Sequence, residues 1–526
     1  MNILVAEAIA PSGIEVLREA GWNVDVRSAT TPTEMEAIIG DYDAVIVRSQ
    51  TRLTARAIQR AQRLKVIGRA GAGVDNVDLE AATARGILVM NTPGSNSVSV
   101  AEHTFGLMLA LMRHLVAANA SVKRGEWERK LFLGRELRGK TLGLIGLGKV
   151  GQEVAKRAKA FGMTVIAHDP FIVERLAQDL DVRLVPLEEL LALSDIISLH
   201  ASLTRATRGM INRETIARMK PGVILINTAR GELVDEAALL EGLDSGRIAA
   251  AGLDVFAEEP PRNRRLLEHP RVLATPHVGA STIEAQELVG VEIALQVRDY
   301  LQSGIIRNAV NFPALTPEEL QRLSPFLELG EKLGAFIAQI ARVRPSEIGI
   351  RYYGELNRAN VYPISNAVLC GVLRQMLDEE VNLINARLKA EERNIEVIET
   401  RSSRARSYAN LISVQLRDGA GGVDWVEGTV LHPENLRLVS VDGVALEIPL
   451  TPYMLLIRNE DVPGVIGRVG TVLGNAQVNI GHFALARGGA DLTAIGVLTL
   501  DSPISDDVLA EIRRLPAIRD VRAILL

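Results

Sequence analysis

Three charged side chains in the middle of the chain could together bind a substrate and move a proton. Arg230, Glu259 and His277 each come shortly after a short apolar run of β-strand type. In open α/β sheets, ligands bind outside the carboxyl ends of the strands. An arginine there can anchor a substrate, and a histidine can act as a base that a glutamate orients. The three residues therefore predict an active site at one edge of a sheet.

The remaining histidines indicate no metal centre. No two of them have a metalloprotease spacing such as HExxH. An isolated histidine is usually a surface residue or a hydrogen-bonded residue of the core. We therefore expect no metal site, and a structural role for His103, His114, His168, His200, His269, His432 and His482.

A glycine-rich turn predicts a dinucleotide site. The sequence GLGKVG at 146–151 follows the apolar run 141–145 and opens a helical pattern at 152–161. In such a turn the first glycine allows the tight bend, the second lets the backbone approach a pyrophosphate, and the third lets helix and strand pack closely. The next apolar run leads to Asp169, whose carboxylate can bind the ribose hydroxyls and repels a 2′-phosphate. The motif predicts NAD rather than NADP; a turn without a ligand is the alternative.

The elements that must position these groups form two blocks of short apolar runs alternating with helical patterns. The first block covers about the first 90 residues, and the second follows a helical stretch at 99–125 and ends near residue 281. Such alternation predicts βαβ units on parallel sheets. A long helix at 283–301 is expected to return the chain to the first block, which makes that block discontinuous.

A linker at 311–313 separates these two blocks from a region in which helical stretches are followed by successive strand-like runs. Residues 317–342 and 363–392 are expected to be helical, and residues 395–449 give strand-like runs with Asp-Gly turns at 418–419 and 442–443. From residue 453 to 526 the order β-α-β-β-α-β predicts a ferredoxin-like unit.

Composition narrows the class of protein. A chain of 526 residues is expected to form about three or four domains. The net charge of −5 argues against a nucleic-acid-coating surface. One cysteine permits no internal disulfide and indicates a reducing compartment. The N-terminus lacks the basic region of a signal peptide, and the longest apolar stretch, 105–112, is far shorter than a membrane span of about 20 residues. We therefore expect a cytoplasmic protein without membrane or nucleic-acid partners.

Five segments resemble the D-isomer-specific 2-hydroxyacid dehydrogenase family, and the two regions after residue 310 resemble the long branch of that family. The strings are RAGAGVDNVD (69–78), GKTLGLIGLGKVGQEVA (139–155), NTARGELVDEAAL (227–239), GLDVFAEEPP (252–261) and TPHVGAST (275–282). The C-terminal region resembles an ACT domain, a ligand-sensing module, through NEDVPGV at 459–465 and QVNI at 477–480.

The resemblance implies an α/β fold with four domains. A doubly wound Rossmann-type NAD-binding domain would cover 99–289, and a discontinuous flavodoxin-like substrate domain would cover 1–98 and 290–310. An α+β intervening domain, similar to allosteric substrate-binding modules, would follow at 315–450, and a ferredoxin-like ACT domain at 453–526.

The resemblance also implies roles for single residues. His277 would accept the proton of the substrate hydroxyl, Glu259 would hold His277, and Arg230 would pair with the substrate carboxylate. Arg48 and Ser49 match positions near the substrate phosphate, and Asn96 matches a position facing the cleft. Gln50 stands where some relatives carry a second arginine, so the phosphate site is less well defined. The implied cofactor-binding residues are Gly146, Gly148, Lys149, Val150, Gly151, Asp169, Thr228, Asp254 and Gly279.

The implied reaction is the oxidation of D-3-phosphoglycerate to 3-phosphohydroxypyruvate with NAD, the first step of L-serine synthesis. Alternatives are a glyoxylate, hydroxypyruvate or 2-oxoglutarate reductase of the same family, or an NAD-sensing relative without activity. Asn459, Asp461 and Asn479 would line an L-serine site between paired ACT domains, with Asn479 beside the turn at 463–464. A purely structural ferredoxin-like unit is the alternative. A homodimer or homotetramer is expected, and the segment around Trp127 would contact the partner.

Overall fold

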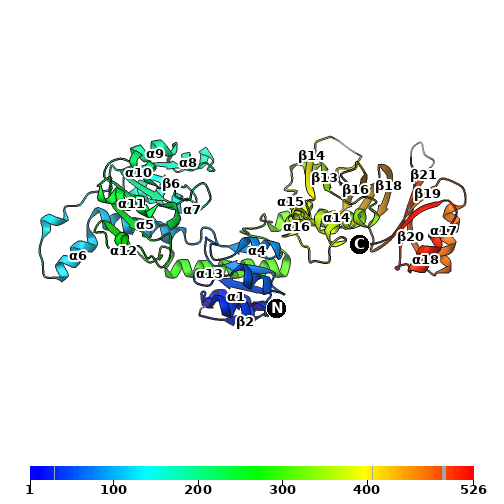
Figure 1. Ribbon diagram of the computed structural model, residues 1–526, viewed down its shortest axis with the longest axis horizontal. Coiled ribbons are helices and arrows are strands. Elements are labelled where there is room, and N and C mark those ends of the chain that lie inside the picture. Colours follow the sequence, from blue (N-terminus) through cyan, green and yellow to red (C-terminus); the bar gives the residue numbers. More distant parts are fainter. Residues whose placement is uncertain (29, 405–406, 489–492) are drawn as a thin grey trace.

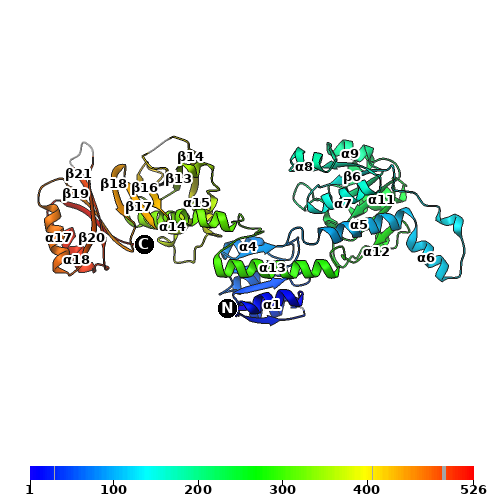
Figure 2. The same cartoon turned by 180° about the vertical axis from the view of Figure 1, so that it is seen from behind.

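The computed structural model describes residues 1–28, 30–404, 407–488 and 493–526. Four β-sheets lie along a long molecule, each in its own lobe (Figure 1). The view from behind shows the same spatial order of lobes, with the lobe of the second sheet at one end of the molecule and that of the fourth sheet at the other (Figure 2).

The first sheet is parallel and has the strand order β2-β1-β3-β4-β5. This order is that of flavodoxin-like folds, as predicted. Helix α13, which follows the second sheet in the chain, packs against α1: a Cβ atom on Gly13 would lie 2.5 Å from the carbonyl oxygen of Gly290. The elements of this lobe are β1 (Asn2–Val5), α1 (Pro11–Glu19), β2 (Asn23–Val26), α2 (Pro32–Ile38), β3 (Ala44–Val47), α3 (Ala55–Arg60), β4 (Val66–Arg69), α4 (Leu79–Ala84), β5 (Leu88–Asn91) and α13 (Ile283–Ser303).

The second sheet is also parallel, with the order β12-β11-β10-β9-β6-β7-β8. Because the chain enters at β6 and winds first to one side and then to the other, this is the predicted doubly wound Rossmann arrangement. Its elements are α5 (Ser97–Met112), β6 (Thr141–Ile145), α7 (Lys149–Ala160), β7 (Thr164–His168), α8 (Glu174–Asp179), β8 (Arg183–Leu184), α9 (Leu187–Leu193), β9 (Ile196–Leu199), α10 (Arg213–Arg218), β10 (Val223–Asn227), α11 (Glu236–Asp244), β11 (Ile248–Leu253), α12 (Arg264–Leu267) and β12 (Val272–Ala274).

The helical stretch expected at 99–125 is two helices rather than one. His114 has a φ of 53°, in the left-handed region, and it separates α5 from α6 (Leu115–Lys123). A non-glycine residue rarely adopts this conformation, and no periodicity in the sequence signals it. Helix α6 projects from the lobe as part of an arm (Figure 1).

The third sheet has the order β14-β13-β15-β16-β17-β18. Strand β13 was not expected, since strands were predicted only from residue 395. The turn Asp442-Gly443 joins β17 to β18 with φ values of 49° and 79°, the positive pair that a two-residue hairpin turn needs. The elements are α14 (Pro317–Ile340), β13 (Glu347–Gly354), α15 (Tyr362–Arg374), α16 (Ala386–Glu391), β14 (Glu396–Ser402), β15 (Asn410–Arg417), β16 (Val423–His432), β17 (Asn435–Val441) and β18 (Val444–Pro449).

The fourth sheet is antiparallel, with the ferredoxin-like order β20-β21-β19-β22. Its two faces are buried differently. Leu455 and Ile457 pack with its own helices, whereas Met454 and Leu456 belong to the core shared with the third sheet. The elements are β19 (Tyr453–Glu460), α17 (Val465–Asn475), β20 (Ile480–Arg487), β21 (Thr493–Leu500), α18 (Asp506–Arg513) and β22 (Ile518–Leu525).

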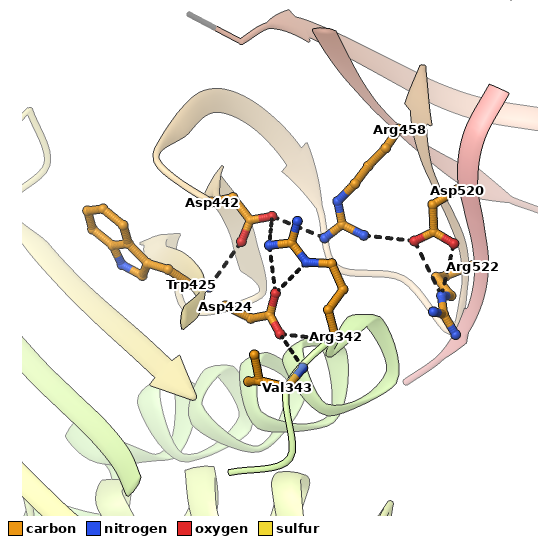
Figure 3. Close-up of polar contacts among 8 residues, drawn as sticks. All are labelled: Arg342, Val343, Asp424, Trp425, Asp442, Arg458, Asp520 and Arg522. Atoms are coloured by element: carbon orange, nitrogen blue, oxygen red, sulfur yellow. Dashed lines mark hydrogen bonds and ion pairs between the residues drawn. The ribbon is translucent and has the colours of Figure 1, made fainter. Parts of the chain in front are cut away.

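A chain of ion pairs joins the third and fourth sheets (Figure 3). Arg342, just after α14, binds Asp424 of β16 at 2.7 Å and Asp442 at 2.9 Å. Asp442 also accepts a hydrogen bond from Arg458 of β19 at 3.1 Å, and Arg458 reaches Asp520 of β22 at 2.9 Å. The two sheets are therefore connected by charges as well as by a common apolar core.

Over the described ranges, no single helix combines the length and apolar character needed to cross a membrane. The bent pair α5 and α6 meets that test by length and composition only.

Candidate active site

Strand order brings the predicted catalytic residues to one edge of the second sheet. Strands β10, β11 and β12 are neighbours and parallel, so their carboxyl ends lie side by side. Glu259 follows β11 and His277 follows β12, and the imidazole Nδ1 lies 2.7 Å from a carboxylate oxygen of Glu259. No described residue hydrogen-bonds Nε2 of His277, so this nitrogen can exchange a proton with a ligand.

Two groups hold the Glu259 carboxylate. One oxygen faces His277 and the other accepts a hydrogen bond from the backbone N–H of Phe256 at 3.2 Å. Burial alone would raise the pKa of Glu259, but the hydrogen bond and charge of His277 outweigh burial, and the pKa is lowered from its ordinary value. Glu259 is therefore a carboxylate at neutral pH and can stabilise a protonated His277.

The buried carboxylate of Asp254 anchors the loop that carries His277. It is 1% exposed and accepts hydrogen bonds from Thr275 Oγ1 at 2.6 Å and from the backbone N–H groups of Val278 and Gly279 at 2.9 and 2.8 Å. His277 itself has a φ of 53°. Asp254 thus fixes an unusual backbone conformation, and its contact with a cofactor remains a prediction.

The glycine-rich turn fits a dinucleotide. Gly146 has a φ of 97°, and a Cβ atom there would lie 2.6 Å from the carbonyl of His200. A Cβ atom on Gly151 would lie 2.3 Å from the carbonyl oxygen of Gly146, so helix and strand pack too closely for any other residue. Nothing lies within 4 Å of the corresponding position on Gly148, so the backbone there is open to a pyrophosphate.

Asp169 is tied to the same turn. One carboxylate oxygen accepts a hydrogen bond from the backbone N–H of Leu147 at 2.8 Å, and the other accepts one from Phe171 at 2.9 Å. Each oxygen keeps a lone pair for a ribose hydroxyl. The carboxylate predicted to select NAD is therefore held next to the glycine-rich turn.

Three further predicted cofactor residues surround this region. Lys149 begins α7 and its side chain passes 3.6 Å from the Cβ position of Gly94, in the loop between the two lobes. Val150 packs into the core below the turn. Thr228 follows β10 and shares a hydrogen bond of 2.9 Å with Thr104 of α5.

The predicted phosphate-binding residues lie on the other lobe. The buried carboxylate of Glu7 accepts hydrogen bonds from the backbone N–H groups of Gln50 and Thr51, at 3.0 and 3.2 Å, and so shapes the loop that presents Arg48 and Ser49. Asn96 precedes α5, and its side chain makes no capping hydrogen bond to that helix. Contact between its amide and a ligand therefore stays a prediction.

Arg69, at the end of β4, is a charged residue of this region to which no role was assigned. Burial, followed by the charge of Arg230, lowers the pKa of Arg69 to about 10, and Arg48 contributes in the same direction. Its guanidinium passes so close to Gly71 that a Cβ atom there would displace it. The signal was the string RAGAGVDNVD, in which the arginine stands directly at the end of a strand.

The predicted effector residues do not meet within one chain. Asn459 of β19 pairs with Ala494 of β21. Asp461, just after β19, binds Arg487 of β20 at 2.9 Å. Both contacts lie at one end of the fourth sheet. Asn479 lies at the opposite end, where its amide donates to Asp501 at 2.9 Å. The expectation that Asn479 lies beside the turn at 463–464 is therefore wrong for a single chain. The reason is that β19 and β20 are both antiparallel to β21, so both begin at the same end of the sheet.

Two observations concern the other histidines and metals. His200 shares a hydrogen bond of 2.9 Å with Ser198, and burial lowers the pKa of His200 to about 3, so the ring is neutral at physiological pH. In the part of the chain that the structure describes, no three His, Cys, Asp or Glu side chains form a group that could hold a metal ion.

Comparison with known proteins agrees with the motifs. Residues 105–279 match the D-isomer specific 2-hydroxyacid dehydrogenase NAD binding domain, 322–442 match the D-3-phosphoglycerate dehydrogenase intervening domain, and 453–517 match the ACT domain. The first of these matches confirms the predicted NAD cofactor.

Relatives extend over the whole chain. The D-3-phosphoglycerate dehydrogenase of Synechocystis sp. is 42% identical over 100% of this chain and 95% of its own length, and that of Bacillus subtilis is 39% identical over 99% of both chains. Among solved structures, a protein from Thermus thermophilus has a TM-score of 0.55 and 39% identity, covering 59% of this chain and all of its own. A glyoxylate reductase from Paecilomyes thermophila has a TM-score of 0.55 and 32% identity, covering 61% of this chain and 99% of its own. The chain belongs to the D-isomer-specific 2-hydroxyacid dehydrogenase family, within the D-3-phosphoglycerate dehydrogenases that carry an intervening domain and an ACT domain.

Proposed function

We propose that this protein oxidises D-3-phosphoglycerate to 3-phosphohydroxypyruvate with NAD, the reaction that opens L-serine synthesis. The observation that carries the proposal is the pair of His277 and Glu259, whose Nδ1 and carboxylate oxygen lie 2.7 Å apart at the same carboxyl edge of the second sheet as the glycine-rich turn. The arginines Arg48, Arg69 and Arg230 lie close enough for their charges to affect one another, and such a group suits a substrate with both a phosphate and a carboxylate.

In this reaction the protein binds, orients and moves a proton. Arg230 holds the substrate carboxylate, and Arg48 and Arg69 hold the phosphate. Nε2 of His277 accepts the proton of the substrate hydroxyl, and Glu259 stabilises the imidazolium that results. NAD, held by the turn at 146–151 and by Asp169, supplies the hydride acceptor. In the reverse direction His277 returns the proton to the 2-oxo group.

The test is the rate of NADH formation with D-3-phosphoglycerate, compared with D-glycerate, D-lactate and D-2-hydroxyglutarate, and the rate of NADH consumption with glyoxylate and hydroxypyruvate. We expect kcat/KM to be highest for D-3-phosphoglycerate. A preference for an unphosphorylated acid would instead identify a reductase such as the glyoxylate reductase named above, and no turnover of any of these would identify a binding protein.

We divide the chain into a substrate domain (1–98 and 290–310), an NAD domain (99–289), an intervening domain (315–450) and an ACT domain (453–526). The packing of α13 on α1 supports the discontinuous first domain. Cys370 is a free, buried thiol, and burial raises its pKa to about 12. A reduced cysteine supports the cytoplasmic location that we propose.

The protein acts as a homodimer, or as a homotetramer built from such dimers. The arm that contains α6 exposes an apolar surface that no other described part of this chain covers, and Trp127 on it is 72% exposed. Its exposed apolar side chains are Leu115, Val116, Val122, Trp127, Leu131 and Leu133. Exposed apolar surface of this kind is typical of subunit interfaces.

L-serine, the product of the pathway, inhibits by binding between two ACT domains. Strand β20 is an edge strand on which Phe483 and Leu485 are 37% and 40% exposed. If two copies pair β20 antiparallel about a two-fold axis, the start of one strand lies beside the end of the other. That pairing brings Asn479 of one chain to the end of the partner's sheet at which Asn459 and Asp461 lie, an approach that a single chain does not make.

A further inference from the structure

An ion pair between Asp75 and Arg230 joins the two N-terminal lobes. Asp75 lies in the loop after β4, on the first sheet, and Arg230 lies after β10, on the second. Nε of Arg230 donates to the Asp75 carboxylate at 2.9 Å. Sequence motifs had indicated Arg230 as a substrate anchor, but they assigned nothing to Asp75.

The contacts of Arg230 fix the plane of its guanidinium. Nη1 donates to the carbonyl oxygen of Ala229 at 2.7 Å, while Nε is held by Asp75. Nη2 lies over Gly73, where a Cβ atom would approach it to 1.8 Å, so a larger residue at 73 would displace the guanidinium. The Nε hydrogen and one Nη1 hydrogen are therefore engaged. The donors that remain for a substrate carboxylate are the two hydrogens of Nη2 and the second hydrogen of Nη1.

The charges around Arg230 explain why it needs such a partner. Arg69 is close enough for the Arg230 charge to lower the pKa of Arg69, and the Asp75 charge acts on Arg69 in the opposite direction. Repulsion between two guanidinium groups favours rotamers that separate them. A carboxylate on Nε counteracts that repulsion without occupying the end of the guanidinium that a substrate would use.

We propose that Asp75 is a positioning residue, which holds Arg230 from the opposite lobe so that the end of its guanidinium meets the substrate carboxylate. This inference rests on the proposed function through the role of Arg230. Asp75 is set in the lobe that binds the phosphate, whereas Arg230 belongs to the lobe that binds NAD. The pair therefore also sets the position of the substrate, whose phosphate and carboxylate are bound by different lobes, relative to the cofactor.

The experiment compares steady-state constants for Asp75→Ala, Asp75→Asn and Glu80→Gln, with NAD saturating. An asparagine can still accept the Nε hydrogen bond through its amide oxygen, whereas alanine cannot. Glu80, on α4 of the same lobe, is exposed and has no described partner, so its substitution removes one negative charge as a matched control. We expect Asp75→Ala to raise KM for D-3-phosphoglycerate about tenfold, which corresponds to about 1.4 kcal/mol, with a smaller change in kcat. Asp75→Asn should restore most of the affinity, and Glu80→Gln should leave KM unchanged.

Two outcomes would overturn the proposal. A lower KM in Asp75→Ala would mean that Asp75 competes with the substrate for Arg230. An equal rise in KM for Asp75→Asn and Asp75→Ala would mean that only the negative charge matters. Failure of the proposed function is distinguishable from both, because the unmodified protein would then not oxidise D-3-phosphoglycerate at all.

Discussion

Asp461 and Asn479 lie at opposite ends of the same four-stranded sheet, although both belong to the segment that resembles a ligand-sensing site. Asp461 is near the end of β19, where it binds Arg487 of β20 at 2.9 Å. Asn479 is next to the start of β20, where Ile480 pairs with Leu500. A ligand that contacts both residues must therefore lie between two chains.

This relationship predicts complementation between subunits. Asp461→Ala and Asn479→Ala should each abolish inhibition by L-serine. If equal amounts of the two variants are unfolded and refolded together, mixed dimers contain one site with both native residues and one with neither. We expect partial inhibition by serine to return in the mixture. If the two residues acted from the same chain, no intact site would form and the mixture would remain insensitive.

The pair of His277 and Glu259 predicts a loss of chemistry rather than of binding. His277→Asn should lower kcat by about 10²–10⁴-fold, because it removes a general base. Glu259→Gln should lower kcat less, since His277 keeps a hydrogen-bond partner but loses the charge that stabilises its protonated form. The Kd of NAD, measured by protein fluorescence, should change little in both variants; a large change would show that the loop carrying His277 had moved.

Asp169 should determine the choice between NAD and NADP. Asp169→Asn keeps an oxygen that can accept the N–H of Leu147 but removes the charge that repels a 2′-phosphate. We expect the ratio of kcat/KM for NAD over NADP to fall by at least about tenfold, equivalent to about 1.4 kcal/mol. Asp169→Ala should also weaken NAD binding, because the turn loses its anchor. An unchanged ratio in both variants would contradict the assignment.

His200 should make the protein sensitive to acid. Burial lowers the pKa of His200 to about 3 from 6.5, so below about pH 6.5 the unfolded chain binds a proton that the folded chain does not. The free energy of unfolding should therefore decrease as the pH is lowered below about 6.5. The contribution of this group is on the order of 1 kcal/mol per pH unit. In thermal unfolding between about pH 7 and about pH 5, His200→Asn should lose less stability than the unmodified protein. Parallel pH profiles would contradict this.

The ion pairs between the third and fourth sheets should contribute to stability through Asp424, whose side chain is fully buried. Of the described partners of this carboxylate, Arg342→Met leaves the backbone N–H groups of residue 342 and Val343. We expect a loss of about 1–3 kcal/mol in the free energy of unfolding of the C-terminal half. Arg344→Met is the control, because Arg344 is exposed and has no described ion pair. Equal stability of the two variants would show that the backbone groups alone satisfy Asp424.

Local patterns were sufficient for the two parallel sheets and the dinucleotide turn. Their strands are short apolar runs with helices between them, and the positions of Gly146, Gly148 and Gly151 depend on contacts within one βα unit. Strand β13 was missed because its side chains alternate only partly between buried and exposed, and because its partners β14 and β15 come much later in the chain. The break at His114 was missed because a single left-handed residue leaves the apolar periodicity intact.

The sequence by itself determined the residue types of the active site, the cofactor and the family, since each depends on motifs that are contiguous in the chain. Only the tertiary structure decided which distant residues meet. Arg230 and Asp75 are 155 positions apart and come together because two lobes face each other. Asp461 and Asn479 are close in sequence but are separated because antiparallel pairing with β21 sends β19 and β20 in the same direction, so that the end of one strand lies far from the start of the other.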